Sequence, residues 1–109
     1  MATHGMIDLE TLGVEPDSVI ITLGAVKFDP TTNAEPHQPL YLRLDIEEQS
    51  EKYGRTIDDN TLEWWGKQKP EIRDEAFGDH ERVNMDTLTK QLNKWCVGLD
   101  YLWCQGPLF

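Results

Sequence analysis

The feature that most constrains the fold is the segment 19–28, VIITLGAVKF, in which apolar and β-branched residues follow one another almost without polar interruption. β-branched residues favour extended backbone, and a run this apolar is unsuited to a strand with one wet face. The segment therefore predicts a central strand that is covered on both faces. Turn-forming residues flank it over 13–18, and residues 29–33, DPTTN, predict a hairpin loop after it.

Two further strands are expected beside this central one. Residues 3–9, THGMIDL, are short and lean apolar. Residues 39–46 place leucine at every second position, which predicts a strand with one face turned to solvent. Short connections separate the three segments, so we expect them to form an antiparallel meander.

Helical patterns occupy the second half of the chain. Residues 47–58 are polar and predict a loop. A helix is expected from residue 59 or 60 to about residue 69, with Asn60 and Glu63 as a capping box. A short helix or turn over 71–77 follows it.

A second clear helix is expected after Asn84, which is a good N-cap, and before Asp100. Its apolar residues recur on one helical face. They are Met85, Leu88, Leu92, Trp95, Cys96 and Leu99. Residues 101–104, YLWC, then predict a fourth strand, which the preceding helix would connect to the sheet as a crossover.

The order of these elements predicts an α/β fold with a mixed sheet. The 109 residues allow one domain, 1–109, rather than two. The last strand normally needs another helix to cover its second face, so the sheet is expected to be incomplete at its C-terminal end.

The charge balance limits the partners that this chain can bind unaided. Asp and Glu number 20 against 10 Lys and Arg, a formal net charge of −10, and no basic stripe is present. The usual electrostatic signature of a duplex-binding protein is therefore missing, although bound divalent cations can bring phosphates to an acidic site. No apolar run is long enough for a membrane helix and the first residues do not resemble a secretory signal, so we expect a cytoplasmic protein without a membrane partner.

Asp8 and Glu10 are the strongest candidates for chemistry. They lie two residues apart at the end of the first predicted strand, so both carboxylates are expected on one face, about 7 Å apart along the chain. Like charges in this arrangement repel unless a cation lies between them, and carboxylate oxygens suit Mg²⁺ or Mn²⁺. Two such ions can stabilise the attacking and leaving oxygens in phosphodiester cleavage. The alternative is a pair of solvated acids without a ligand.

The segment that contains these acids resembles a known family. Residues 7–11, IDLET, are similar to the first motif, D-x-E-T, of the DEDD-type 3′–5′ exonucleases, proofreading-exonuclease-like enzymes with an RNase H-like fold. Residues 6–30 resemble the opening β-hairpin of the phage and bacterial branch. Residues 61–65, TLEWW, resemble its T-L-x-W-W helix, and residues 103–109, WCQGPLF, the approach to its second motif. The resemblance extends over almost the whole chain in the family's order.

This resemblance implies a hydrolase that removes nucleotides from the free 3′ end of DNA or RNA with two Mg²⁺ or Mn²⁺ ions. Asp8 would bridge both ions, and Glu10 would ligate one of them near the nucleophilic water. The backbone around Thr11 and Leu12 would contact the terminal nucleotide, and Phe109 would line the substrate pocket. The expected location is the cytoplasm of a bacterial or phage-infected cell.

The family's remaining catalytic residues have no match in the sequence. The second acidic motif would place an Asp after Phe109, and the third, with a His or Tyr base and a further Asp, would lie beyond it. The 109-residue chain alone is therefore expected to be inactive or nearly so. Tyr41 and Asp45 fit the spacing Tyr-x-x-x-Asp, but they precede the second motif, and we interpret the match as coincidence.

Two alternatives remain at this point. The chain could be half of a split enzyme that needs a complementary chain or a homo-oligomer, or an acidic interaction module that keeps an exonuclease-like fold. A small metal-binding or polymerase-associated regulatory domain is a weaker third hypothesis, because no specific motif supports it. Trp64 and Trp65 could stack on bases, but core packing is the more frequent role of such a pair, and adjacent helical residues point about 100° apart.

Overall fold

A computed structural model describes residues 2–104, and five strands form one mixed sheet in this part of the chain. The strands are β1 (His4–Thr11), β2 (Ile20–Phe28), β3 (His37–Leu44), β4 (Arg82–Val83) and β5 (Tyr101–Cys104), arranged in the order β4-β3-β2-β1-β5. β1, β2 and β3 pair antiparallel, whereas β5 is parallel to β1. The predicted α/β class, central strand, meander and crossover strand are confirmed, and the two-residue β4 is an element that the sequence did not predict.

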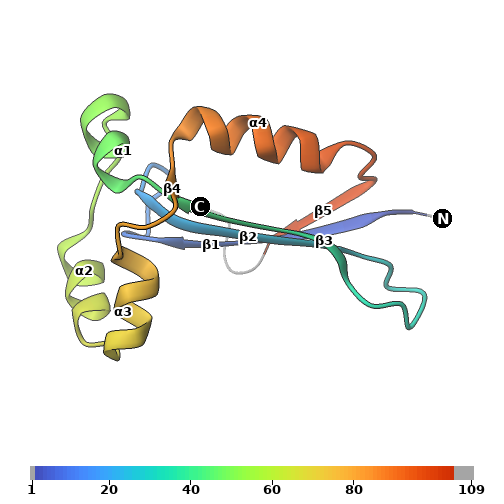
Figure 1. The fold of residues 1–109 in the computed structure, drawn as a ribbon, viewed down its shortest axis with the longest axis horizontal. Coiled ribbons are helices and arrows are strands. Elements are labelled where there is room, and N and C mark those ends of the chain that lie inside the picture. The colour runs from blue at the N-terminus through green and yellow to red at the C-terminus, as the bar shows by residue number, and fades with distance from the viewer. Residues whose placement is uncertain (1, 105–109) are drawn as a thin grey trace.

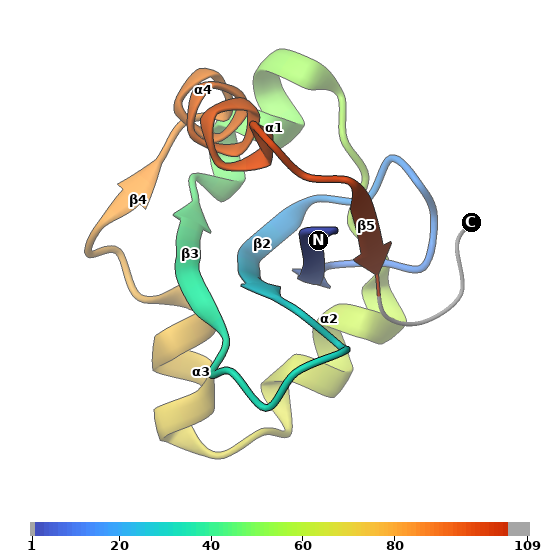
Figure 2. The ribbon, with the colours of Figure 1, turned by 90° about the vertical axis from the view of Figure 1, so that its right-hand side faces the viewer.

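Four helices accompany the sheet within the described residues. They are α1 (Ile46–Tyr53), α2 (Asp59–Gly66), α3 (Pro70–Phe77) and α4 (Met85–Cys96). Figure 1 shows α4 lying along one face of the sheet, while α1, α2 and α3 gather at one end of it. Figure 2, a view along the strands, shows α2 and α3 on the side of the sheet opposite to α4.

The helix α4 forms as its sequence pattern predicts. The side chain of Asn84 accepts a hydrogen bond from the backbone N–H of Thr87 at 2.8 Å, which caps the first turn. Leu88 and Trp95 are buried against the sheet. Their partners in this main core are Leu23, Ala25, Leu42 and Leu44. The helix ends at Cys96, four residues before the predicted end at Asp100.

The helix α1 contradicts the loop predicted over 47–58. Asp45 caps it by accepting a hydrogen bond from the N–H of Glu48 at 3.0 Å, and Gly54 ends it in the left-handed region at φ 63°. The helix buries a polar residue, Gln49, whose amide bonds both the N–H and the C=O of Ile20 at 2.8 and 2.7 Å. The sequence of α1 shows no apolar periodicity, because the helix contacts the sheet through the polar side chain of Gln49.

The helix α2 is shorter than predicted. Its N-cap is Asp58, which accepts a hydrogen bond from the N–H of Thr61 at 2.9 Å, and its last residue is Gly66 rather than Lys69. The capping box expected at Asn60 was therefore two residues too late. Trp65 is 7% exposed and packs in a second core cluster, as expected, but Trp64 is 55% exposed, so core packing of both side chains was wrong.

One face of the central strand is open where two-sided cover was expected. Gly24 and Val26 of β2 are half-buried. Figure 1 shows that, within residues 2–104, α2 and α3 lie at one end of the sheet and no helix runs along the face opposite to α4. All four residues of β5 are exposed. No helix in the described region is long and apolar enough to cross a membrane.

Candidate active site

Asp8 and Glu10 share the sheet face that is opposite to α4. Gly5 faces α4, because a Cβ there would lie 2.7 Å from the Trp95 ring, and Ile7 packs on the same core. Side chains alternate along a strand, so Asp8 and Glu10 point to the other face. Both residues are exposed. The structure thus places the two carboxylates as the D-x-E spacing predicts, at the end of β1 toward α2 and α3 (Figure 1).

Two rows of residues cross this face from β1 to β3. In the first row, Asp8 pairs with Gly24, and Gly24 pairs with Tyr41. Gly24 has no side chain, so the space between the Asp8 carboxylate and the Tyr41 ring is open at its centre. A Cβ built on Gly24 would have one neighbour within 4 Å, Tyr41 Cδ1 at 4.0 Å.

The second row borders a hollow between the sheet and the helices α2 and α3. Glu10 pairs with Thr22, and Thr22 pairs with Arg43. The hollow has a volume of about 320 Å³ and is mostly apolar. Its walls are Glu10, Thr22, Tyr41, Trp65, Glu71, Ile72, Glu75 and Ala76. A flat apolar group that carries hydrogen-bond donors would suit a hollow with this lining.

The environment of Glu10 disfavours its charged form. Partial burial raises the pKa of the Glu10 carboxyl above its usual value, and the nearby charge of Asp8 raises the pKa further. A cation bound between the two carboxylates would reverse both effects, because it compensates the lost hydration and the repulsion. The electrostatics of the apo site therefore match the repulsion that the sequence analysis expected of this pair.

The raised pKa of Glu10 predicts a pH-dependent gain in stability for Glu10→Gln. A carboxyl with a raised folded-state pKa destabilises the fold when it is ionised, so wild type loses stability as pH rises from below about 4.5 through the folded-state pKa. Glu10→Gln removes this loss. Thermal unfolding should show a higher melting temperature for the variant at pH 7 and no difference below pH 4. A variant that is less stable than wild type at pH 7 would contradict the assigned repulsion.

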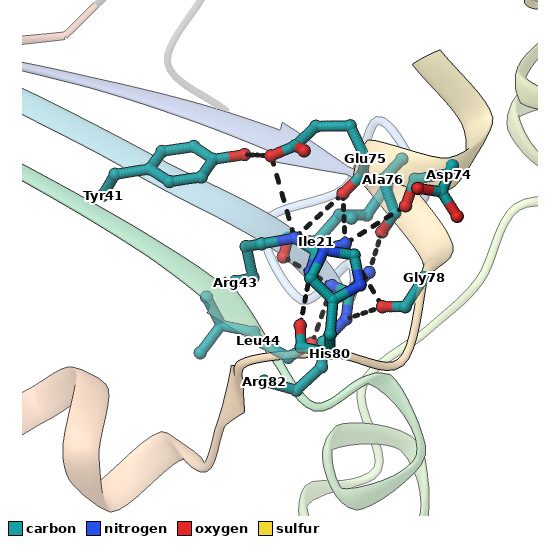
Figure 3. Close-up of polar contacts among 10 residues, drawn as sticks. All are labelled: Ile21, Tyr41, Arg43, Leu44, Asp74, Glu75, Ala76, Gly78, His80 and Arg82. Atoms are coloured by element: carbon teal, nitrogen blue, oxygen red, sulfur yellow. Dashed lines mark hydrogen bonds and ion pairs between the residues drawn. The ribbon is translucent and has the colours of Figure 1, made fainter. Parts of the chain in front are cut away.

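Arg43 supports the wall of the hollow from inside the protein. It is 5% exposed, and its guanidinium donates to the backbone C=O of Glu75 at 3.0 and 2.6 Å. It also donates to the carbonyls of Asp74 and Gly78, both at 3.2 Å, and to that of His80. Figure 3 shows these bonds converging on the C-terminal end of α3. The alternation in β3 was predicted correctly. The face of β3 that was expected to be exposed to solvent is exposed only in part, because Arg43 is buried on it.

Arg82 of β4 makes a second set of bonds to the same region (Figure 3). Its guanidinium donates to Gly78 O at 2.9 Å and to Ala76 O, and on the sheet side to Leu44 O at 3.1 Å and Ile21 O at 3.3 Å. Burial lowers the pKa of Arg82, and the positive charge of Arg43 lowers the pKa further. The two arginines together fix α3 to β2 and β3.

Tyr41 and Glu75, two walls of the hollow beside Glu10, are joined by a hydrogen bond. The Tyr41 hydroxyl donates to Glu75 Oε1 at 2.6 Å, and Arg43 Nε lies 3.8 Å from the same oxygen. The hydrogen bond from Tyr41 and the charge of Arg43 lower the pKa of Glu75, while burial and this bond raise the pKa of Tyr41. Tyr41 therefore keeps its proton near neutral pH and acts here as a donor.

The donor set at Asp8 and Glu10 suits part of a Mg²⁺ or Mn²⁺ site. Both side chains offer hard oxygen ligands on one face, and the repulsion that raises the Glu10 pKa favours a cation between them. Within residues 2–104, however, no group of three or more Asp, Glu, His or Cys residues is placed to hold a metal ion. Full coordination therefore requires ligands from water, from substrate phosphate or from outside the described residues.

The other residues expected to bind substrate lie in different environments. Thr11 O accepts a hydrogen bond from the Trp65 indole at 3.3 Å, and the Thr11 hydroxyl donates to Gly13 O at 2.8 Å. Leu12 is 1% exposed, and its N–H donates to Val19 O at 2.9 Å. Phe109 lies outside the described residues. Their contacts with a nucleotide stay predictions.

Several residues that line the site were not identified from the sequence. Gly24 gave no signal, because an isolated glycine in a strand has many explanations. Ile72 and Glu75 lie on a short helix whose face could not be assigned. Tyr41 was noted only for its spacing to Asp45, which caps α1 and is remote from the hydrogen bond of Tyr41 to Glu75. The pairing register of β1, β2 and β3 was the missing information.

Comparison with known proteins defines the class to which this mixed sheet and its D-x-E pair belong. The model of the 3′–5′ exoribonuclease Rv2179c-like domain family matches residues 3–109. The chain therefore belongs to this family. The resemblance to 3′–5′ exonucleases drawn from residues 7–11 is confirmed.

One curated relative and one solved structure are similar to this chain. An exodeoxyribonuclease of Enterobacteria phage T4 is 27% identical over 117 residues, which include 95% of this chain and 50% of the relative. The chain thus spans about half the length of this curated relative. The crystal structure of cell-death related nuclease 4 (CRN-4) matches with a TM-score of 0.45 and 15% identity, over 92% of this chain and 34% of that one.

Proposed function

We propose that this domain carries the first acidic motif of a 3′–5′ exonuclease that hydrolyses phosphodiester bonds with divalent metal ions. The observation that carries the proposal is the pair Asp8 and Glu10, two mutually repelling carboxylates on one sheet face of a 3′–5′ exoribonuclease-like domain. The hollow beside Glu10 supports it by offering an apolar space of about 320 Å³ for a nucleoside.

The reaction is the attack of water on the terminal phosphodiester. A bond forms between the water oxygen and phosphorus, the bond from phosphorus to the 3′ oxygen breaks, and that oxygen takes a proton. The products are a nucleoside 5′-monophosphate and a strand shortened by one nucleotide. Bound Mg²⁺ or Mn²⁺ would supply a more acidic water and charge compensation at the phosphate. Asp8 and Glu10 would hold the ions, and a general base from outside this chain would accept the proton from water.

Metal removal tests the proposal. The natural polypeptide that contains these residues should shorten 5′-labelled oligonucleotides one nucleotide at a time in Mg²⁺ or Mn²⁺, and excess EDTA should stop the reaction. Addition of the metal should restore it. Activity that persists in EDTA, or cleavage that begins inside the strand, would contradict the proposal.

The same assay tests two finer points. DNA and RNA oligonucleotides should be compared, because the family description names an exoribonuclease and the T4 relative is named an exodeoxyribonuclease. The isolated 109-residue chain is expected to be inactive, since it offers two acids of the four that the resemblance implies. The proposed place of action is the cytoplasm of a bacterial or phage-infected cell.

A second candidate function is that of one half of a two-chain assembly. The strand β5 favours it, because it is an edge strand of the sheet formed by residues 2–104, and its Tyr101, Leu102 and Trp103 are each more than half exposed. This function predicts that sedimentation of the isolated chain shows a dimer or a complex with a second chain. A monomer at micromolar concentration would count against it.

A further inference from the structure

Tyr41 lies between two hollows on the face that carries the candidate carboxylates. One hollow contains Glu10, Trp65 and Ile72 among its walls, and Tyr41 is also one of them. The other has a volume of about 340 Å³, is almost wholly apolar, and contains Asp8, Gly24 and Tyr41. Each hollow therefore holds one of the two carboxylates, and the Tyr41 ring contributes to both.

The second hollow exists because Gly24 lacks a side chain. Its remaining walls are Met6, Ala25, Val26, Pro39 and Leu40. Gly24 lies in the middle of the row from Asp8 to Tyr41, and its backbone does not need a glycine, since its φ is not in the left-handed region. The conformation of β2 therefore does not require glycine here, and the space above it is free for another occupant.

The Tyr41 ring is presented in a fixed direction. Tyr41 is 54% exposed, but its hydroxyl donates a hydrogen bond to Glu75. The carboxylate of Glu75 in turn lies 3.8 Å from Nε of the buried Arg43 (Figure 3). An exposed aromatic side chain held at its far end loses little further freedom when a flat group stacks on it. Aromatic rings held in this way are typical platforms for nucleobases.

We propose that Tyr41 and Gly24 form a second nucleoside-contacting position of the exonuclease site. This inference rests on the proposed function. A substrate that occupies the site places one nucleoside in the hollow beside Glu10 and the adjacent nucleoside over Gly24, against the ring of Tyr41. Tyr41 is a substrate-binding residue in this arrangement and takes no part in proton transfer.

Two substrates of different length test this position in the full natural polypeptide. A p-nitrophenyl ester of a nucleoside 5′-monophosphate contains one nucleoside, whereas a dinucleotide contains two. Tyr41→Ala should raise KM for the dinucleotide about tenfold, the expected loss of one base–aromatic contact, and raise KM for the ester by a smaller factor, because Tyr41 also borders the hollow beside Glu10. kcat should stay within about twofold for both, and Tyr41→Phe should restore the dinucleotide KM because it keeps the ring.

Filling the space over Gly24 gives an independent variant. Gly24→Val adds side-chain atoms to the second hollow, and a Cβ there meets no atom closer than 4.0 Å. The melting temperature should stay equal or rise, because glycine weakens a strand, while KM for the dinucleotide rises and KM for the ester does not. Gly66→Ala, at a position with no neighbour within 4 Å of a Cβ, and Tyr53→Ala, an exposed tyrosine of α1, are the matched controls.

The outcomes separate this inference from the proposed function. An inactive wild type in the presence of metal overturns both. An active wild type whose Tyr41→Ala and Gly24→Val variants change neither KM overturns only the second nucleoside position. An equal loss on the ester and the dinucleotide also overturns it, because the contact would then belong to the first nucleoside.

Discussion

Replacing Asp8 with asparagine is expected to lower the rate of nucleotide release by at least about 100-fold, because the neutral amide holds a divalent ion far less well than a carboxylate. The same change should leave the melting temperature equal or higher. Burial and, after it, the charge of Asp8 raise the pKa of Glu10, so removing the Asp8 charge relieves a repulsion and is not expected to weaken the fold. Loss of activity with no loss of stability is the signature of a site residue.

The control is an acid of the same protein that lies away from this face. Glu35 is exposed in the loop between β2 and β3, and Glu35→Gln should change neither rate nor stability. Rates are measured with a 5′-labelled oligonucleotide over a range of Mg²⁺ concentrations. If Asp8→Asn retained more than a tenth of the wild-type rate at saturating Mg²⁺, the assignment of Asp8 as a metal ligand would be wrong.

Arg43→Ala is expected to lower the free energy of unfolding by about 3 kcal/mol, because several partly buried backbone carbonyls lose the donor that they share. Wild-type Arg43 donates to the backbone oxygens of Asp74, Glu75, Gly78 and His80. Urea unfolding of the variant and of wild type measures the difference. Arg43→Lys should recover only part of it, since one ammonium cannot serve the set of carbonyls that a planar guanidinium reaches.

A matched control is available on the supported helix itself. Arg73 is an exposed residue of α3, and Arg73→Ala should change the free energy of unfolding by less than about 0.5 kcal/mol. A loss smaller than about 1 kcal/mol for Arg43→Ala would show that water replaces the guanidinium at the carbonyls. The support of α3 by Arg43 would then be weaker than the geometry indicates.

The elements that the sequence predicted well are those with a periodic apolar face. The alternating leucines of β3 and the stripe of α4 face the same core, and Asn84 caps α4 as expected. The sequence predicted that β5 joins the sheet after a crossover helix, whereas its parallel pairing with β1 was not predicted. Asp8 and Glu10 could be placed on one face because two residues along a strand return a side chain to the same side.

The elements that the sequence did not predict are held by polar contacts. The helix α1 buries Gln49 rather than an apolar stripe, and Arg43 is buried on a strand face expected to be wet. Tyr41 and Gly24 belong to the site only because β2 pairs with both β1 and β3 in one particular register. Side-chain periodicity fixes which face a residue occupies, but it does not give the neighbours across strands.

The support of α3 by Arg43 and Arg82 affects how this site can change over generations. Arg43 and Arg82 hold α3 through its main-chain oxygens, which every amino acid possesses, rather than through its side chains. Mutation of Ile72 or Glu71, which face the hollow beside Glu10, would therefore leave this support in place. If the hollow binds a nucleoside as proposed, its preference for one nucleobase or another can therefore change by single substitutions while the architecture around it is inherited unchanged.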